Sequence, residues 1–190
     1  QSLLGAGCFE AQDSGLSAFG REVVDEMNRV GMIIDLSHAG HKTAMDVVAY
    51  STRPVAVTHA NPNIWHAAPR NIHHDLLQAL SDTGGMVGFS LYPHHLKSGS
   101  ECSLMEFSQM ATEMVEIYGN EMFGIGSDLC QDQPDSVVNW MRNGHWRKIS
   151  TPPAVFPDCP VWFCDNRDFL TLAGGFKAAG LPAEHVAGIL

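Results

Sequence analysis

Two histidines stand at the same place in two consecutive apolar segments of the chain. "IIDLSH" (33–38) ends on Ser37-His38, and "VAVTHA" (55–60) carries Thr58-His59 at the end of its apolar run. Neutral imidazole is the commonest protein metal ligand. A single histidine at a strand end is more often a hydrogen-bonding residue than a ligand. Because two histidines stand at matching positions on consecutive strands, we treat His38 and His59 as candidate metal ligands.

An acid and an arginine have comparable positions. Asp128 follows "FGIGS", the end of a later apolar segment, where a carboxylate can ligate a metal or act as a base beside it. Arg70, in "APRNIHHDLL", lies on the loop after the second strand. A guanidinium there suits bidentate capture of a substrate carboxylate, although a surface salt bridge remains the alternative.

Other polar residues near these segments receive simpler interpretations. Asp35 lies within a strand but points opposite to its neighbours, so we expect a hydrogen-bonded structural role. His73 and His74 begin a helix and are expected to be exposed. His94 and His95 follow the third strand in "LYPHHL", closer to the candidate site, and are interpreted as loop residues.

Helical and strand periodicities alternate along the chain, which predicts βαβ units and a parallel sheet. Parallel strands point their carboxyl ends to one rim, where the candidate residues would meet. Four such units are half of a (β/α)8 barrel, a fold of about 250 residues. The expected helices cover 17–30, 41–51, 74–85, 103–119, 168–180 and 182–190, and the expected strands cover 32–38, 54–59, 86–92 and 122–129.

We expect residues 1–190 to form a single domain, a partial (β/α) barrel. The chain begins without a first strand and stops within a helix at "HVAGIL", which suggests a piece of a larger protein. Residues 130–165 are predicted as a long Pro- and Trp-bearing loop within the domain. Its Trp140, Trp146 and Trp162 favour a packed lid or an interface over a linker.

Composition excludes several classes of function. The formal net charge is −10, and no basic stripe occurs, which argues against a nucleic-acid partner. No apolar run approaches the ~18 residues that span a bilayer. The 5 cysteines are scattered and odd in number, which favours neither a disulfide framework nor a zinc knuckle. The compartment is left open.

The segments "GLSAFGREVVDEMNRVGMIIDLSH", "RPVAVTHA", "PRNIHHDLL" and "GIGSDL" resemble, in order and spacing, the C-terminal half of the membrane (renal) dipeptidase family of zinc peptidases. The resemblance is strong over residues 15–129, and the tail from Asp165 looks like bacterial members. It implies a (β/α)8 TIM barrel of the metal-dependent hydrolase type, to which this chain contributes strands 5–8. Two zinc ions bridged by a carboxylate would occupy the intact site.

The same resemblance implies individual roles. His38 and His59 would bind the second zinc, Arg70 would hold the C-terminal carboxylate of the substrate, and Asp128 would serve the attacking water and protonate the departing amine. The implied reaction is hydrolysis of small dipeptides, including those with a C-terminal D-residue. A homodimer is left open.

This sequence also departs from the family pattern. The H-x-D pair of strand one, the bridging Glu of strand three and the histidine after strand four belong to sequence that is absent here. The family commonly continues D-x-D-G after strand eight, whereas this chain has Asp128-Leu129-Cys130-Gln131.

Two alternatives stay open. One is a mononuclear amidohydrolase that uses His38, His59 and Asp128 as a two-histidine, one-carboxylate set. The other is a non-catalytic, barrel-derived binding protein that contacts its partner through the Trp-bearing loop.

Overall fold

The computed structural model describes residues 2–129, 132–143 and 156–190. At its centre is a parallel sheet in the order β1-β2-β3, formed by β1 (Ala56–Val57), β2 (Met86–Phe89) and β3 (Phe123–Ile125). Val57 pairs with Val87, which in turn pairs with Phe123. The predicted α/β class and the parallel sheet are therefore both present.

The first expected strand, 32–38, is much shorter than predicted. It contributes a single parallel bridge between Asp35 and Ala56, closed by Leu36 N–H to Ala56 O at 2.8 Å and Ala56 N–H to Ile34 O at 2.9 Å. Met32 and Ile33 are 58% and 72% exposed. Within the described residues no strand pairs with its outer edge, so the segment lacks the second ladder that would extend it.

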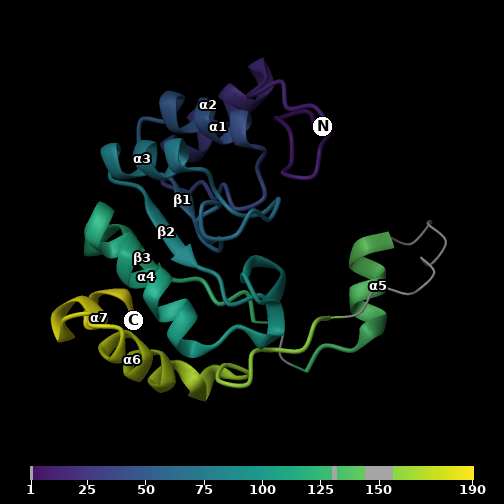
Figure 1. The fold of residues 1–190 in the computed structure, drawn as a ribbon. Coiled ribbons are helices and arrows are strands. Elements are labelled where there is room, and N and C mark those ends of the chain that lie inside the picture. Colours follow the sequence, from purple (N-terminus) through teal and green to yellow (C-terminus); the bar gives the residue numbers. More distant parts are fainter. Residues whose placement is uncertain (1, 130–131, 144–155) are drawn as a thin grey trace.

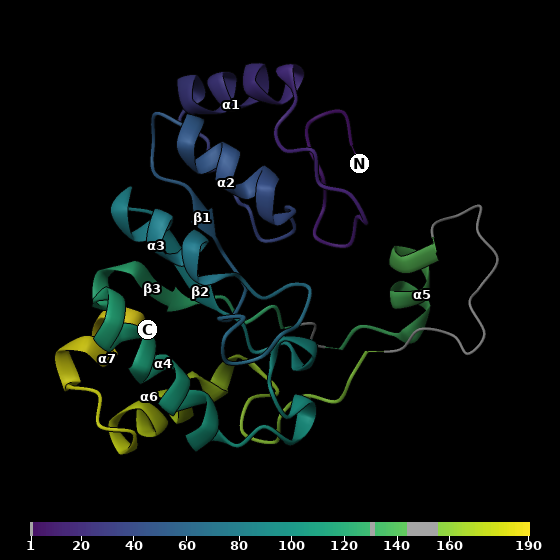
Figure 2. The same cartoon turned by 45° about the horizontal axis from the view of Figure 1, so that its top comes forward.

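Helices stack in chain order around the sheet (Figures 1 and 2). The first packs on the second and the second on the third, while α4 packs on α6 and α6 on α7. All six helices expected outside the long loop are present. They are α1 (Ala18–Val30), α2 (His41–Tyr50), α3 (His74–Asp82), α4 (Leu104–Tyr118), α6 (Phe169–Ala178) and α7 (Ala183–Ile189).

Local chemistry sets the helix boundaries. The Ser17 hydroxyl accepts the Gly20 N–H at the start of α1, and Gly31, with φ of 74°, ends that helix in the left-handed conformation. Ser103 caps α4 in the same way by accepting the Glu106 N–H. None of the described helices is both long and apolar enough to cross a bilayer.

The apolar stripe of α4 forms much of the core, as its periodicity predicts. Phe107 is fully buried and meets Phe89 edge-on, with ring centroids 6.3 Å apart. The apolar face of α1 is buried only in part, because Val24 is enclosed whereas Phe19 and Val30 are about half exposed.

The predicted 130–165 loop contains a helix, α5 (Asp135–Asn143), which extends away from the stacked helices (Figure 1). Trp162 is packed against Phe107 and donates its indole N–H to Cys102 O at 2.6 Å. Trp140 on α5 is about half exposed. Trp146 lies outside the described residues.

Two glycines let the carboxyl ends of the strands approach one another. A Cβ on Gly88 would lie 2.0 Å from the Thr58 carbonyl oxygen, and one on Gly126 would lie 1.7 Å from the same atom. Both distances are far below van der Waals contact. The backbone after β1 therefore rests directly against the ends of β2 and β3, and this contact positions the residues of the rim.

Candidate functional site

The two predicted metal ligands lie side by side. His38 follows the bridge segment and His59 follows β1, and their Nε2 atoms are 3.2 Å apart. The ring centroids are 5.2 Å apart, with the planes inclined by 57°. Burial, followed by the charge of Arg70 and by His59, lowers the pKa of His38, which favours the neutral form that can bind a cation.

Asp35 supports this pair from below, in the hydrogen-bonded role expected for it. Its Oδ1 accepts the Ser37 hydroxyl at 2.5 Å, and its Oδ2 accepts the Thr58 hydroxyl at 2.7 Å. Burial alone would raise the pKa of Asp35, but the hydrogen bonds from Ser37 and Thr58 outweigh it and lower the pKa. The carboxylate is thereby held ionised beneath the two imidazoles.

These hydrogen bonds also determine the tautomer of His59. The Thr58 hydroxyl lies 2.9 Å from His59 Nδ1, and it already donates its single proton to Asp35. It can therefore only accept from His59, so Nδ1 carries the proton. The lone pair of His59 is left on Nε2, the atom that faces His38.

The arrangement suits part of a zinc site. Two imidazoles on one tetrahedral Zn²⁺ have nitrogens roughly 3.3 Å apart, close to the separation found here. A catalytic zinc usually has three protein ligands. No group of three or more His, Cys, Asp or Glu side chains in the described ranges is arranged to hold a metal. The mononuclear alternative needs Asp128 as the third ligand, and the described residues do not group Asp128 with the two histidines.

Arg70 is not the surface salt bridge considered as its alternative. Its side chain is buried, with the residue 7% exposed, and one guanidinium nitrogen, Nη2, donates to His59 O at 3.2 Å. The other, Nη1, is buried and has no hydrogen-bond partner in the part of the chain that the structure describes. Burial lowers the pKa of Arg70, with smaller opposing effects from Cys8, Asp128 and Asp35. A buried donor without a partner is ready for an anionic ligand.

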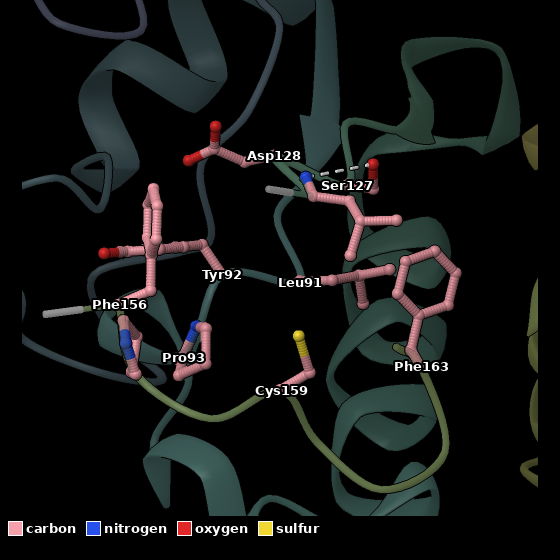
Figure 3. Close-up of a pocket in the computed structure, with 10 residues that line it drawn as sticks. Leu91, Tyr92, Pro93, Ser127, Asp128, Phe156, Cys159 and Phe163 are labelled. Atoms are coloured by element: carbon pink, nitrogen blue, oxygen red, sulfur yellow. Dashed lines mark hydrogen bonds between the residues drawn. The ribbon is translucent and has the colours of Figure 1, made fainter. Parts of the chain in front are cut away.

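Asp128 occupies the rim beyond β3, with a φ of 51° in the left-handed region that aspartate tolerates. It borders a small cavity of about 30 Å³, lined also by Leu91, Cys159 and Phe163, but its carboxylate points away from the Cys159 sulfur and the Phe163 ring (Figure 3). That cavity is too small for a dipeptide. Asp128 also borders a second cavity of about 880 Å³, shared with His38 and Arg70. The larger cavity lies within the size range of small-molecule sites.

One residue of this larger cavity was not predicted as functional. His95 was interpreted as a loop residue, but it lies in a short 3₁₀ helix, η1 (Pro93–His95), and is only 3% exposed. Its Nδ1 is 2.7 Å from the Ser90 hydroxyl. The signal available in the sequence was Ser90 itself, which stands at the end of β2 as Thr58 stands at the end of β1.

A parallel α/β sheet whose carboxyl edge carries paired imidazoles, a carboxylate and a buried guanidinium is typical of metal-dependent hydrolases. The sequence model of the membrane dipeptidase family, peptidase family M19, matches residues 3–141. The chain belongs to this family, which is a family of metallopeptidases.

Similar proteins agree with this assignment. An uncharacterized dipeptidase of Schizosaccharomyces pombe and the dipeptidase aclJ of Aspergillus oryzae are each 35% identical, over 62% and 63% of this chain. The chain covers only 29% of the length of each.

Solved structures show the same fold. An amidohydrolase from Pseudomonas aeruginosa superimposes with a TM-score of 0.88 at 32% identity, over 100% of this chain and 58% of its own. A metallopeptidase from Rhodobacter sphaeroides, liganded with a phosphinate mimic of the dipeptide L-Ala-D-Ala, gives a TM-score of 0.74 at 22% identity, over 92% of this chain and 44% of its own.

Proposed function

We propose that the protein carrying this chain is a zinc dipeptidase built on a (β/α)8 barrel. Residues 1–190 would form one domain that supplies strands 5–8 and their helices. The observation that carries the proposal is the 3.2 Å separation of the His38 and His59 Nε2 atoms, with the lone pair of His59 directed to the gap. The family and its dipeptidase members support the substrate class.

His38 and His59 would hold one zinc of a two-zinc centre, whose other ligands lie outside the described residues. Zn²⁺, when bound, supplies a Lewis acid that polarises a carbonyl and lowers the pKa of water to about 7. Asp35 would keep His59 in the tautomer that can bind a cation, through Thr58.

Arg70 and Asp128 would act on the two ends of the reacting peptide. The unpartnered Nη1 of Arg70 would bind the C-terminal carboxylate and fix which end of the dipeptide enters the cavity first. The carboxylate of Asp128 would accept a proton from the attacking water and pass it to the departing nitrogen. A C-terminal D-residue is part of the proposal, since the phosphinate bound by the Rhodobacter sphaeroides protein mimics L-Ala-D-Ala.

The test is a double substitution, His38→Ala with His59→Ala, in the protein that carries this chain. We expect zinc content to fall by about one ion per chain and dipeptide hydrolysis to fall at least ~10³-fold. His185→Ala is the matched control. His185 lies on α7, which packs on β3 and on the turn before β3, whereas His38 and His59 lie at the ends of the bridge segment and of β1. Undiminished hydrolysis in the double variant, with folding verified by circular dichroism, would refute the proposal.

A further inference from the structure

Like His59, His95 has its Nδ1 within hydrogen-bond distance of a hydroxyl, but the proton of this contact lies on the hydroxyl and not on the ring. His95 lines the cavity of about 880 Å³ together with Arg70, His38 and Asp128. Its Nδ1 lies 2.7 Å from Ser90 Oγ. Within the described residues, its other ring nitrogen, Nε2, has no hydrogen-bond partner.

The surroundings of Ser90 assign the proton in this contact. The Ser90 side chain is fully buried, and its Oγ accepts the Tyr92 N–H at 3.2 Å. A buried hydroxyl also has one proton to donate, and His95 Nδ1 is the acceptor that the described residues offer it. Ser90 therefore donates to Nδ1, and the single proton of the neutral imidazole lies on Nε2.

The ring is neutral at any ordinary pH. Burial, followed by the charge of Arg70, lowers the pKa of His95 to about 3. Arg70, His59, His94 and His38, which are cationic or able to become so, lower the pKa of His95 further. The surroundings of His95 thus favour a ligand that is an anion or a hydrogen-bond acceptor.

His95 is also held at a fixed place relative to Arg70. Asn71, the residue directly after Arg70, donates its side-chain amide to His95 O at 3.0 Å. Asn61 donates to His95 O at 3.1 Å and to Ser90 O at 2.9 Å, and it is fully buried. The loop that carries the guanidinium therefore also positions the imidazole.

We propose that His95 is a substrate-binding residue whose Nε2–H donates to the C-terminal carboxylate of the dipeptide, beside the guanidinium of Arg70. The inference rests on the proposed function and adds to it a second donor for the same carboxylate. The neutral N–H of His95 and the charged guanidinium of Arg70, both held at fixed positions, would orient the carboxylate as well as bind it.

Two substitutions separate this role from a structural one. His95→Gln keeps an N–H donor near the position of Nε2 but loses the acceptor at Nδ1. His95→Asn keeps an acceptor near Nδ1 but removes the donor at Nε2. The measurements are KM and kcat of the zinc-loaded protein for a dipeptide and for its C-terminal amide, together with calorimetric binding of a phosphinate dipeptide mimic.

We expect His95→Asn to raise KM for the dipeptide, and to weaken binding of the phosphinate, by roughly 10- to 100-fold, the usual effect of losing a hydrogen bond to a charged group. Its kcat should change less than about threefold, and its preference for the acid over the amide should shrink. His95→Gln should stay within about fivefold of the wild-type KM.

Equal losses in His95→Asn and His95→Gln would overturn the inference in favour of a structural role, and an unchanged KM in His95→Asn would overturn it outright. Both results leave the dipeptidase proposal standing. If the wild type neither hydrolyses dipeptides nor binds the phosphinate, the proposed function itself fails, and the role of His95 fails with it.

Discussion

Thr58–His59 and Ser90–His95 are two versions of one contact, a hydroxyl against an imidazole Nδ1, with opposite direction. Thr58 donates its proton to Asp35 and so accepts from His59, whereas the proton of the buried Ser90 hydroxyl, which accepts the Tyr92 N–H, has His95 Nδ1 as its acceptor. Whether the hydroxyl has another acceptor for its proton decides where the imidazole proton lies. One ring then presents a lone pair and the other presents a donor.

The supports of the two histidines differ in charge as well. A carboxylate, Asp35, lies beneath the His38–His59 pair, where a cation is expected, and neutral amides from Asn61 and Asn71 hold His95, where an anion is expected. A carboxylate in the place of either amide, in direct contact with His95, would repel the substrate carboxylate that we propose His95 binds. The comparison indicates that local hydrogen bonding, and not residue type alone, assigns the role of each histidine.

The largest effect should come from adding a charge to the neutral support. Asn61→Asp would place an anionic oxygen against the carbonyls of Ser90 and His95 in a fully buried position. We expect the free energy of unfolding to fall by about 3–5 kcal/mol, measured by urea denaturation. Asn63→Asp, in the same loop but less buried, is the control. Equal stability of the two variants would show that the neutral support is not required.

A smaller effect, on pH dependence, should separate the two supports. The pKa of His95 is about 3 in the folded protein and about 6.5 in the unfolded chain, so its contribution to stability is complete above pH ~6.5 and is lost as the pH falls toward 3. The pKa of Asp35 is lowered from 3.8, so its contribution is present above pH ~4 and is lost only below it.

We therefore expect His95→Gln to flatten the pH dependence of unfolding between about pH 6.5 and 4, and Asp35→Asn to change it only below about pH 4. Chemical denaturation of both variants across pH 3–8 checks this. Identical profiles for the two variants would remove the distinction between the supports.

The smallest effect concerns the tautomers themselves. In the metal-free protein, ¹⁵N NMR should show His59 protonated on Nδ1 and His95 on Nε2. Ser90→Ala should release the preference of His95 at a stability cost of about 1 kcal/mol, while the His59 signals stay unchanged. The same tautomer for both rings in the wild type would contradict the proton positions that we assign to His59 and His95.

The proximity of His38 and His59 could be predicted from the sequence because each follows the carboxyl end of a strand segment, whereas the burial of Arg70, on a loop, could not. Nor could the burial of His95, because it depends on amides from Asn61 and Asn71, more than 20 residues earlier in the chain. Helix α5 was also missed, since the prolines and tryptophans of the 130–165 segment obscure its short apolar periodicity. The strand predicted over 32–38 was too long. Its apolar composition suggested a full strand, but among the described residues the segment pairs with a neighbour on one side only.

Gly88 and Gly126 bring main chain against main chain at Thr58 O. The interval between neighbouring strand tips is consequently set by peptide groups, which cannot change rotamer. Repacking the outer helices, by mutation or by heat, should therefore change the unfolding rate of the protein well before it changes which ligand the protein selects.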